Sequence, residues 1–580
     1  MGSEDVTKPR LSDEEALKLF KERMAVSDPV VESYEDKWAR LDRVYHGETK
    51  DPKKQEDNGK SRLRIPWAWQ QIETIIPRIM DPSPKFGFMP VEPTDAKKSI
   101  VWNRLTRKQL DMDRFVTRQR SWIEDGCVKG LAVSKTIWKQ TKKEALVRPP
   151  RSLSDKLLGR SPEMKREQRV VENRPTIKYI PPEDFRWDPT AIRDEDLEWG
   201  ADRSWRTMAY LEKMQRAGVY KNVKEVKAAV QDASNRRSVR ETPKEAQARR
   251  QGKYAIWEMH DREGNLIAVC NGVLIRNIQS PFAHLDLPYS TFRSQPSNHS
   301  LVGVSEVEKI EHIQQAIWTL DNQRIDAISL TLNPVFKVDP TIRGWKNLTF
   351  RPGLKIPATR GQEFEQIRID ANAAPSWGLT EAYIGAVQQM TGANPIMFGA
   401  DPSTFGINQE TATGASIMQE EGNKRMAMKK LEFRLFEARI AKLMLQLNHQ
   451  YLSDFELFRI VGDDGLKTDR PSVEEIPMFL DVIPEGMSES LSKSVERNSM
   501  IEVMNLLGPL HMMPMHDGTA VSIQKIIERI VSNYDIDVGD VFIPQEYMTP
   551  PSMPGVPEGG ANIEPSVEDE VHNMNEVMNQ

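Results

Sequence analysis

Cysteine is scarce in this sequence, and neither sign of charge is in large excess. Only two cysteines, Cys127 and Cys270, occur among the 580 residues. This number rules out a disulfide framework and suits a reducing compartment. The formal net charge is −5, so the chain as a whole has no electrostatic attraction for nucleic acid. Any contact with DNA therefore has to be local or geometric.

Long hydrophobic runs are also missing. No apolar stretch approaches the roughly 18 residues that a bilayer-spanning helix needs. The first residues, MGSEDVTKPR, have neither the basic start nor the apolar run of a signal peptide. We therefore expect a soluble protein made inside a cell, with a core drawn from the 38% of residues that are hydrophobic. By length the chain predicts about three or four domains, or one large elaborated subunit.

The motifs of common enzymes are absent or incomplete. Gly59-Lys60-Ser61 imitates the end of a phosphate-binding loop, but Lys54 stands where the pattern needs an earlier glycine. There is no HExxH zinc motif and no Gly-x-Ser-x-Gly elbow. The acidic run 193–198 (RDEDLE) lacks the spacing and the glycine of a calcium loop, and we interpret it as a solvated turn. We predict no enzyme activity, no metal site and no cofactor.

Helical periodicity dominates the first part and the centre of the chain. Ser12 and Glu15 form a capping-box pattern that opens one helix, and a second helix is predicted after Pro29. Others are predicted after Pro66 and from Lys97 to about Gly126. Longer helices are predicted over 304–332, 378–390 and 410–452. The last of these has an apolar seam made of Phe433, Phe436, Ile440, Leu443, Leu447 and Tyr451.

Alternating and β-branched segments predict strands between these helices. They cover 133–139, 175–180 and 254–258, and a hairpin over 266–278 turns at Asn271-Gly272. Polar insertions over 148–174 and 221–253 interrupt them. The second insertion holds ten Lys or Arg against four Asp or Glu, and we interpret it as a charged surface loop that lacks aromatic residues for stacking on bases. The resulting fold class is α+β, mainly helical.

The segment 392–414, GANPIMFGADPSTFGINQETATG, lies between two predicted helices and differs from an ordinary linker. Four glycines and two prolines make it unsuitable for the interior of a helix or strand. It nevertheless carries large apolar side chains that a solvated linker does not need. One interpretation is a helix–helix connector whose apolar residues pack on its own subunit; the other follows from the resemblance described below. The residues at issue are Asn394, Pro395, Ile396, Met397, Phe398, Phe405 and Ile407.

Several stretches, in this order, resemble the portal proteins of tailed double-stranded DNA bacteriophages. Residues 63–93 look like an apolar helix followed by the family's Pro-rich exit. Residues 125–139 and 180–199 are similar to the wing region, in which a strand leads to a D-P turn. Residues 298–336 look like the stem helix entering the clip. Residues 391–426 resemble the second stem helix, the tunnel loop and the long helix beyond it. The resemblance extends over about residues 30–530. It consists of the order of these stretches and their general residue pattern, without one invariant motif.

The resemblance implies a portal-type subunit that forms a closed ring. It divides the chain into 1–300 (N-terminal helices and α/β wing), 301–333 (first stem helix), 334–376 (clip), 377–391 (second stem helix), 392–409 (tunnel loop), 410–486 (long wing helix and return strands), 487–533 (helical crown) and 534–580 (acidic, Pro-rich flexible tail). Asn394–Ile407 would then be the loop that meets DNA in the channel.

The resemblance also implies partners and a location. Portal proteins form a ring, usually of twelve subunits, at one capsid vertex of the virion, after assembly in the host cytoplasm. Double-stranded DNA passes through the channel during packaging, retention and ejection. The terminase large subunit, the major capsid protein and scaffold, and tail adaptor proteins dock on the ring, and no membrane is involved. The alternatives are another structural head or tail component, or a DNA-packaging enzyme, which would need a metal cluster or an intact phosphate loop.

Overall fold

The computed structural model describes residues 9–48, 61–80, 86–90, 96–147, 165–227, 247–248, 250–284, 286–332, 335–338, 364–367, 374–393, 412–452 and 480–484, and all structural statements concern these residues. The chain divides into two units, 1–487 and 488–580, and the described residues all belong to the first. The predicted helical crown (487–533) and acidic tail (534–580) lie outside them. None of the described helices is long and apolar enough to span a membrane.

The first element is one continuous helix, α1 (Asp13–His46). The predicted capping box is present, because the Glu15 amide donates to Ser12 Oγ (3.3 Å) and the Ser12 amide donates to the Glu15 carboxylate (2.9 Å). The prediction of two helices separated at Pro29 is wrong. A proline inside a helix costs about 3 kcal/mol, but the side chains on one face of α1 are buried along both halves, and their packing outweighs this cost. They include Phe20, Met24, Val31, Trp38 and Leu41.

Three further helices follow: α2 (Trp67–Ile79), α3 (Ala96–Met112) and α4 (Phe115–Val128). The single helix predicted over 97–126 is therefore interrupted. The break is at Arg114, which has a left-handed conformation with φ 54°. The preceding Asp113 is buried and accepts hydrogen bonds from the Ile177 amide (3.2 Å) and from Arg118 (3.0 Å). These two contacts explain a break that periodicity alone does not reveal.

A five-stranded antiparallel sheet has the order β4-β5-β6-β7-β8. Its strands are β4 (Phe185–Trp187), β5 (Trp199–Thr207), β6 (Lys253–Asp261), β7 (Asn265–Cys270) and β8 (Val273–Gln279). The predicted hairpin is confirmed, since Asn271 and Gly272 both have positive φ at the β7–β8 turn. Alternate residues of β7 face opposite sides: Ile267 packs with the start of α1, whereas Ala268 packs with α6 (Met208–Arg216).

A second sheet has the order β3-β2-β9, with β2 (Ala132–Val147), β3 (Lys165–Ile180) and β9 (Tyr289–Phe292). The polar insertion predicted over 148–174 is therefore partly wrong, because residues 165–174 continue β3 and pair with β2 through a bulge at Thr141/Lys142. The charged residues of this part of β3 hide the strand from a pattern of hydrophobicity. The solvated turn predicted at 193–198 is also wrong in part. Asp194, in the 3₁₀ turn η4 (Asp194–Asp196), is buried and accepts from the Thr291 amide of β9 (2.9 Å).

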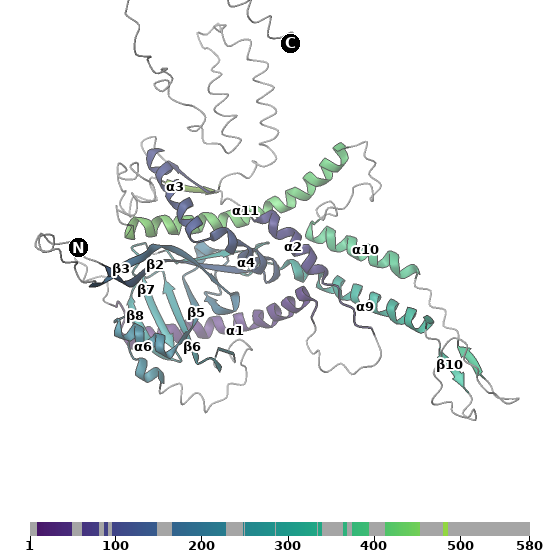
Figure 1. Ribbon diagram of the computed structural model, residues 1–580, viewed down its shortest axis with the longest axis horizontal. Coiled ribbons are helices and arrows are strands. Elements are labelled where there is room, and N and C mark those ends of the chain that lie inside the picture. Colours follow the sequence, from purple (N-terminus) through teal and green to yellow (C-terminus); the bar gives the residue numbers. More distant parts are fainter. Residues whose placement is uncertain are drawn as a thin grey trace, which may run out of the picture. The chain divides into compact units, whose positions relative to one another are not determined.

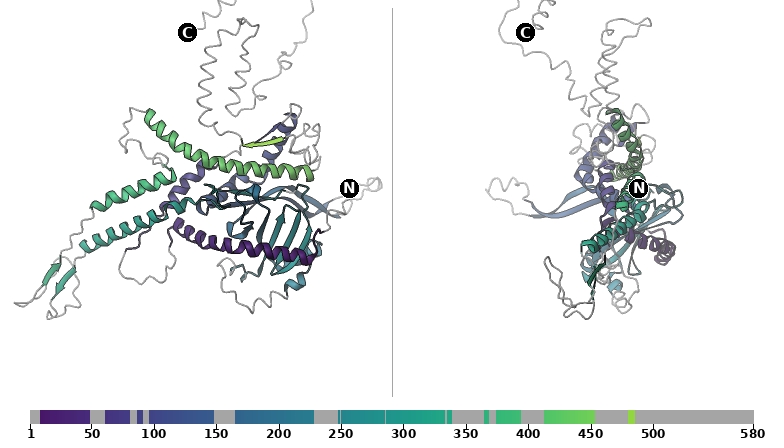
Figure 2. Two further views of the ribbon diagram at one scale, coloured as in Figure 1. Left: turned by 180° about the vertical axis from the view of Figure 1, so that it is seen from behind. Right: turned by 90° about the vertical axis from the view of Figure 1, so that its right-hand side faces the viewer.

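Two long helices, α9 (Glu306–Leu332) and α10 (Ala374–Thr391), run side by side in opposite directions (Figures 1 and 2). They correspond to the predicted helices 304–332 and 378–390, and their bounds differ from the predicted ones by a few residues. Between them in sequence, β10 (Val335–Val338) and β11 (Phe364–Ile367) form an antiparallel pair, in agreement with the short strands predicted over 335–375. The remaining residues of that segment lie outside the described ones.

The helix α11 (Ala412–Tyr451) completes the largest hydrophobic core (Figure 1). The predicted seam is confirmed, because five of its six residues are buried. Phe433, Phe436 and Ile440 pack with α2, α4 and β9. Polar bonds join α11 to α3 as well: the side-chain amides of Gln109 and Asn448 donate to each other, both at 2.7 Å. A short pair, β1 (Phe86–Pro90) with β12 (Leu480–Pro484), also joins the start of the chain to its later part.

Candidate functional site

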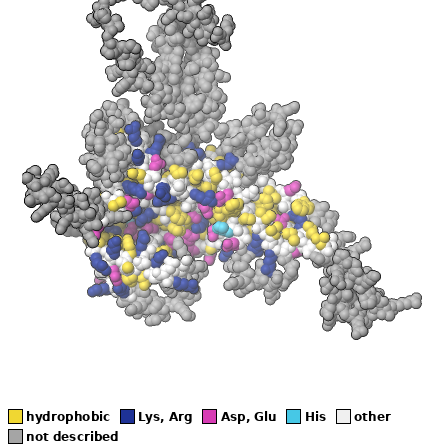
Figure 3. Space-filling model, viewed as in Figure 1, with side chains coloured by type: hydrophobic (Ala, Val, Ile, Leu, Met, Phe, Trp, Pro, Cys, Tyr) yellow, Lys and Arg dark blue, Asp and Glu magenta, His cyan; other side chains and the backbone are white. Residues whose placement is uncertain are grey.

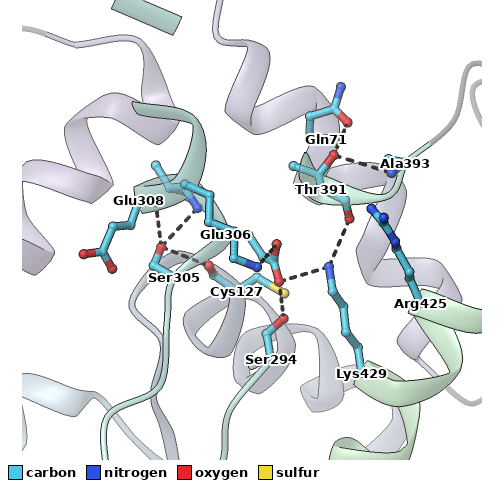
Figure 4. Close-up of polar contacts among 12 residues, drawn as sticks. Gln71, Cys127, Ser294, Ser305, Glu306, Glu308, Thr391, Ala393, Arg425 and Lys429 are labelled. Atoms are coloured by element: carbon cyan, nitrogen blue, oxygen red, sulfur yellow. Dashed lines mark hydrogen bonds and ion pairs between the residues drawn. The ribbon is translucent and has the colours of Figure 1, made fainter. Parts of the chain in front are cut away.

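Four helices come together where the described chain stops after Ala393: the end of α4, the start of α9, the end of α10 and the middle of α11 (Figure 4). Ser305 starts α9. Its hydroxyl accepts hydrogen bonds from the amides of Val307 (3.1 Å) and Glu308 (3.3 Å) and donates to the carbonyl of Val128 at the end of α4 (2.5 Å). The first turn of α9 is thus capped and attached to α4 by the same side chain.

Glu306, in the first turn of α9, is the centre of the polar contacts. Its side chain is completely buried and lies 2.9 Å from the Lys429 ammonium and 3.0 Å from the Lys309 ammonium. Ser294 Oγ donates a third bond of 2.9 Å. Burial alone would raise the pKa of Glu306, but the two lysines outweigh it and hold that pKa below its usual value. The positive end of the α9 dipole favours the same charged form.

The end of α10 is fixed from two sides. Thr391 Oγ1 donates to the Gln71 side chain of α2 (3.0 Å), and the Ala393 amide lies 3.4 Å from the same hydroxyl. Gly392 has φ +77°, which closes the helix, and its amide donates to the Gln388 carbonyl (2.9 Å). A Cβ at position 392 would lie 3.2 Å from Arg425 Cδ. The chain therefore leaves α10 in a defined direction.

Two cations of α11 cap the carbonyl end of α10. Arg425 donates to the Gln389 carbonyl (2.6 Å), and Lys429 donates to the Thr391 carbonyl (3.2 Å). Positive side chains at a helix C-terminus satisfy otherwise unpaired carbonyls and interact well with the dipole. We call Gln71, Ser294, Glu306, Lys309, Thr391, Arg425 and Lys429 the junction cluster.

An open cavity of about 530 Å³ adjoins the junction cluster. Met390 and Met428 lie on its wall and are exposed, the latter to 63%. Methionine side chains adapt to the shape of a partner, so this wall suits contact with another surface. The lining also includes Pro296, Lys309 and Arg425.

The cluster is built for holding rather than for acid–base or nucleophilic chemistry. Its charges bind one another or backbone carbonyls. The nearby thiol of Cys127 is a poor nucleophile, because burial raises its pKa to about 12. Among the described residues, no three His, Cys, Asp or Glu side chains are grouped as metal ligands.

A second feature is the exposed apolar surface of the α9–α10 pair (Figure 3). Leu332 is 74% exposed and Trp377 57% exposed, although both are large apolar residues. The two helices are nonetheless firmly joined, since the Arg324 guanidinium of α9 lies 4.0 Å from the Trp377 ring centroid and 2.6 Å from Thr380 Oγ1. Contiguous exposed apolar surface indicates an interaction site. Ile325, Ile328 and Leu379 extend it.

All seven residues predicted for the site, Asn394, Pro395, Ile396, Met397, Phe398, Phe405 and Ile407, lie outside the described residues, so their role stays a prediction. Sequence reasoning missed the junction cluster that fixes the end of α10, just before that segment. Two signals were present: Ser305 precedes Glu308 with capping-box spacing, and Gln71 is a polar residue on the apolar face of α2.

Comparison with known families assigns the chain to a class of structural proteins, the phage portal proteins. The matching family is described as the phage SU10 portal protein, and its model matches residues 159–530, well over half of the chain. The chain belongs to this family. The match includes the five-stranded sheet, α9, α10 and α11. No curated protein matched.

Proposed function

We propose that this protein forms the DNA channel at one vertex of a phage capsid, as a closed ring of identical subunits, usually twelve in such proteins. The observation that carries the proposal is the family match over residues 159–530. The ring would serve genome packaging, retention and ejection, and would dock the terminase, the capsid and scaffold, and the tail adaptors. The chain itself would have no ATPase or nuclease activity.

The exposed apolar surface of α9 and α10 supports the ring. An isolated subunit would leave Ile325, Ile328 and Trp377 in water, whereas neighbouring copies in a ring would cover them. A ring needs a heterologous contact, in which two different faces of each subunit meet. In this proposal α9 and α10 are the stem helices, and the β10–β11 pair belongs to the clip.

The position of residues 394–407 supports a role in meeting DNA. The segment starts immediately after the end of α10, and its apolar side chains could press on DNA without strong ion pairs. Weak attachment to phosphate suits a channel through which DNA has to slide, because tight binding of phosphates would stall movement.

Imaging of the purified protein by electron microscopy tests the proposal. We expect discrete closed rings with a central hole, together with a solution mass that is a whole multiple of the subunit mass. A protein that stays monomeric over a wide concentration range, or that forms open filaments, would contradict it.

A further inference from the structure

Lys429 connects two helix ends of opposite polarity. Its ammonium lies 2.9 Å from the Glu306 carboxylate in the first turn of α9 and 3.2 Å from the Thr391 carbonyl in the last turn of α10 (Figure 4). A carboxylate is favourable at a helix N-terminus and a cation at a C-terminus. One ammonium group thus satisfies both ends, and it is nearly buried, with 11% of its side chain exposed.

The two groups that Lys429 binds differ in the partners that they keep when Lys429 is removed. Glu306 keeps Lys309 and Ser294 as partners if Lys429 is removed, so its charge would not be left alone. The carbonyl of Thr391, in contrast, receives the Lys429 bond, while Arg425 donates to a different carbonyl, that of Gln389. Lys429 is therefore the contact that joins the last turn of α10 to the first turn of α9.

We propose that Lys429 is a positioning residue: it fixes the direction in which the chain leaves α10 at Gly392 and couples that direction to the start of α9. The inference rests on the proposed function, because it assigns to this contact the placement of the segment that would meet DNA. Movement of the α9–α10 pair relative to α11 would then shift the starting point of that segment, since both helix ends share one ammonium group.

Amide hydrogen exchange on the purified full-length protein tests the local part. In Lys429→Met we expect exchange at Gly392 and Ala393 to become about tenfold faster, because loss of a charge-assisted bond frees the last turn of α10. Lys429→Arg should restore slow exchange. Lys442→Met is the matched control on the same helix, where an exposed pair with Asp286 (3.4 Å) is broken. Unchanged exchange in Lys429→Met would overturn the proposal.

A second variant distinguishes loss of the Lys429 contact from general unfolding. Arg425→Met removes the other α11 bond to the end of α10 without leaving a buried charge, because Arg425 is exposed and its bond among the described residues is to the Gln389 carbonyl. It should raise exchange at the end of α10 by a smaller factor and leave exchange at the start of α9 unchanged. Equal acceleration in both helices by both variants would mean that the cluster is only a structural contact, which would overturn the assignment of Lys429.

The functional part is measured in phage particles that carry the variants. We expect Lys429→Met to form rings with normal yield and to retain less DNA per particle, with recovery in Lys429→Arg. Faster exchange with normal DNA content would overturn the positioning role while leaving the ring intact. Absence of rings in the wild-type protein would instead contradict the proposed function, so the two failures are distinguishable.

Discussion

His284 is a buried histidine outside the junction cluster. Its ring stacks on that of Phe282, with centroids 5.4 Å apart, and burial lowers its pKa to about 4. The unfolded chain takes up a proton near pH 6.5, whereas the folded chain does so only near pH 4. Stability from neutral His284 is therefore present above about pH 6.5 and is lost progressively as the pH falls to 4, by about 3 kcal/mol.

We expect His284→Phe to reduce the acid sensitivity of folding in this window. The measurement is the free energy of unfolding from denaturant titrations at several pH values between 4 and 7. His46→Phe, which replaces an exposed histidine of α1, is the matched control for the substitution itself. An unchanged slope in His284→Phe would show that other groups cause the acid sensitivity.

Gly126 has no Cβ, and this allows the ring of Phe292 to pack closely against α4. A Cβ at this position of α4 would lie 2.5 Å from two ring carbons of Phe292. That ring cannot retreat easily, because it is buried against Phe433 and Phe436. We expect Gly126→Ala to lower the free energy of unfolding by about 1–2 kcal/mol, because overpacking outweighs the better helix propensity of alanine.

Thermal or denaturant unfolding measures this effect. The matched control is Gly385→Ala in α10, where the added Cβ meets nothing within 4 Å. This control should be neutral or stabilising, by up to about 1 kcal/mol. A stabilising Gly126→Ala would mean that the Phe292 ring moves freely.

Features that depend on residues close together in the chain were predictable from the sequence. Features that depend on residues far apart in the chain were not. Ser12 with Glu15 and Asn271 with Gly272 act on their own neighbours in the chain, so spacing reveals them. Glu306 and Lys429 are 123 residues apart, and no periodicity links them. The solvated interpretation of Asp194 failed for the same reason, since its partner Thr291 is far away in sequence.

At the scale of elements, the long amphipathic helices were the easiest to predict, because a repeated apolar seam gives the same signal over many turns. Helix α11 begins and ends within a few residues of its prediction. Errors arose where packing overrode a local signal, as at Pro29 within α1, or where charged residues concealed a strand, as in β3.

The prediction at the scale of elements concerns the segment between α10 and α11. Replacing residues 394–407 with a short Gly/Ser linker should leave ring assembly largely intact, because α10 and α11 are held by the junction cluster and by the α11 core seam. Packaged or retained DNA should decrease. Ring yield and encapsidated DNA are to be scored separately, in parallel with wild-type particles.

Two outcomes would contradict this prediction. Normal DNA content in normal rings would mean that the segment is only a connector, and loss of the ring would mean that it packs between subunits. Phe398 and Phe405 are expected to matter more than any charged residue, so single alanine variants at these positions should reproduce part of the defect. The contact should also depend weakly on salt.

At the scale of the whole molecule, assembly is the property to test. We expect Ile325→Asp/Ile328→Asp to abolish rings and to leave a folded subunit, because both side chains are exposed on α9 and only a neighbouring copy would cover them. Circular dichroism checks folding, and light scattering measures mass. Val26→Asp on α1 is the control, since Val26 is 62% exposed and apolar as well. Rings that survive the double substitution would place the contact between copies elsewhere.

The contact of Gln109 with Asn448 has a consequence for synthesis of the chain. These residues are separated by 339 positions, and at translation rates of about 5–20 residues per second the second follows the first after roughly 20–70 s. Until α11 emerges from the ribosome, the apolar face of α2 lacks the helix that it contacts most. Nascent chains would therefore depend on chaperones during this interval, and a slower ribosome would lengthen the period in which they can aggregate.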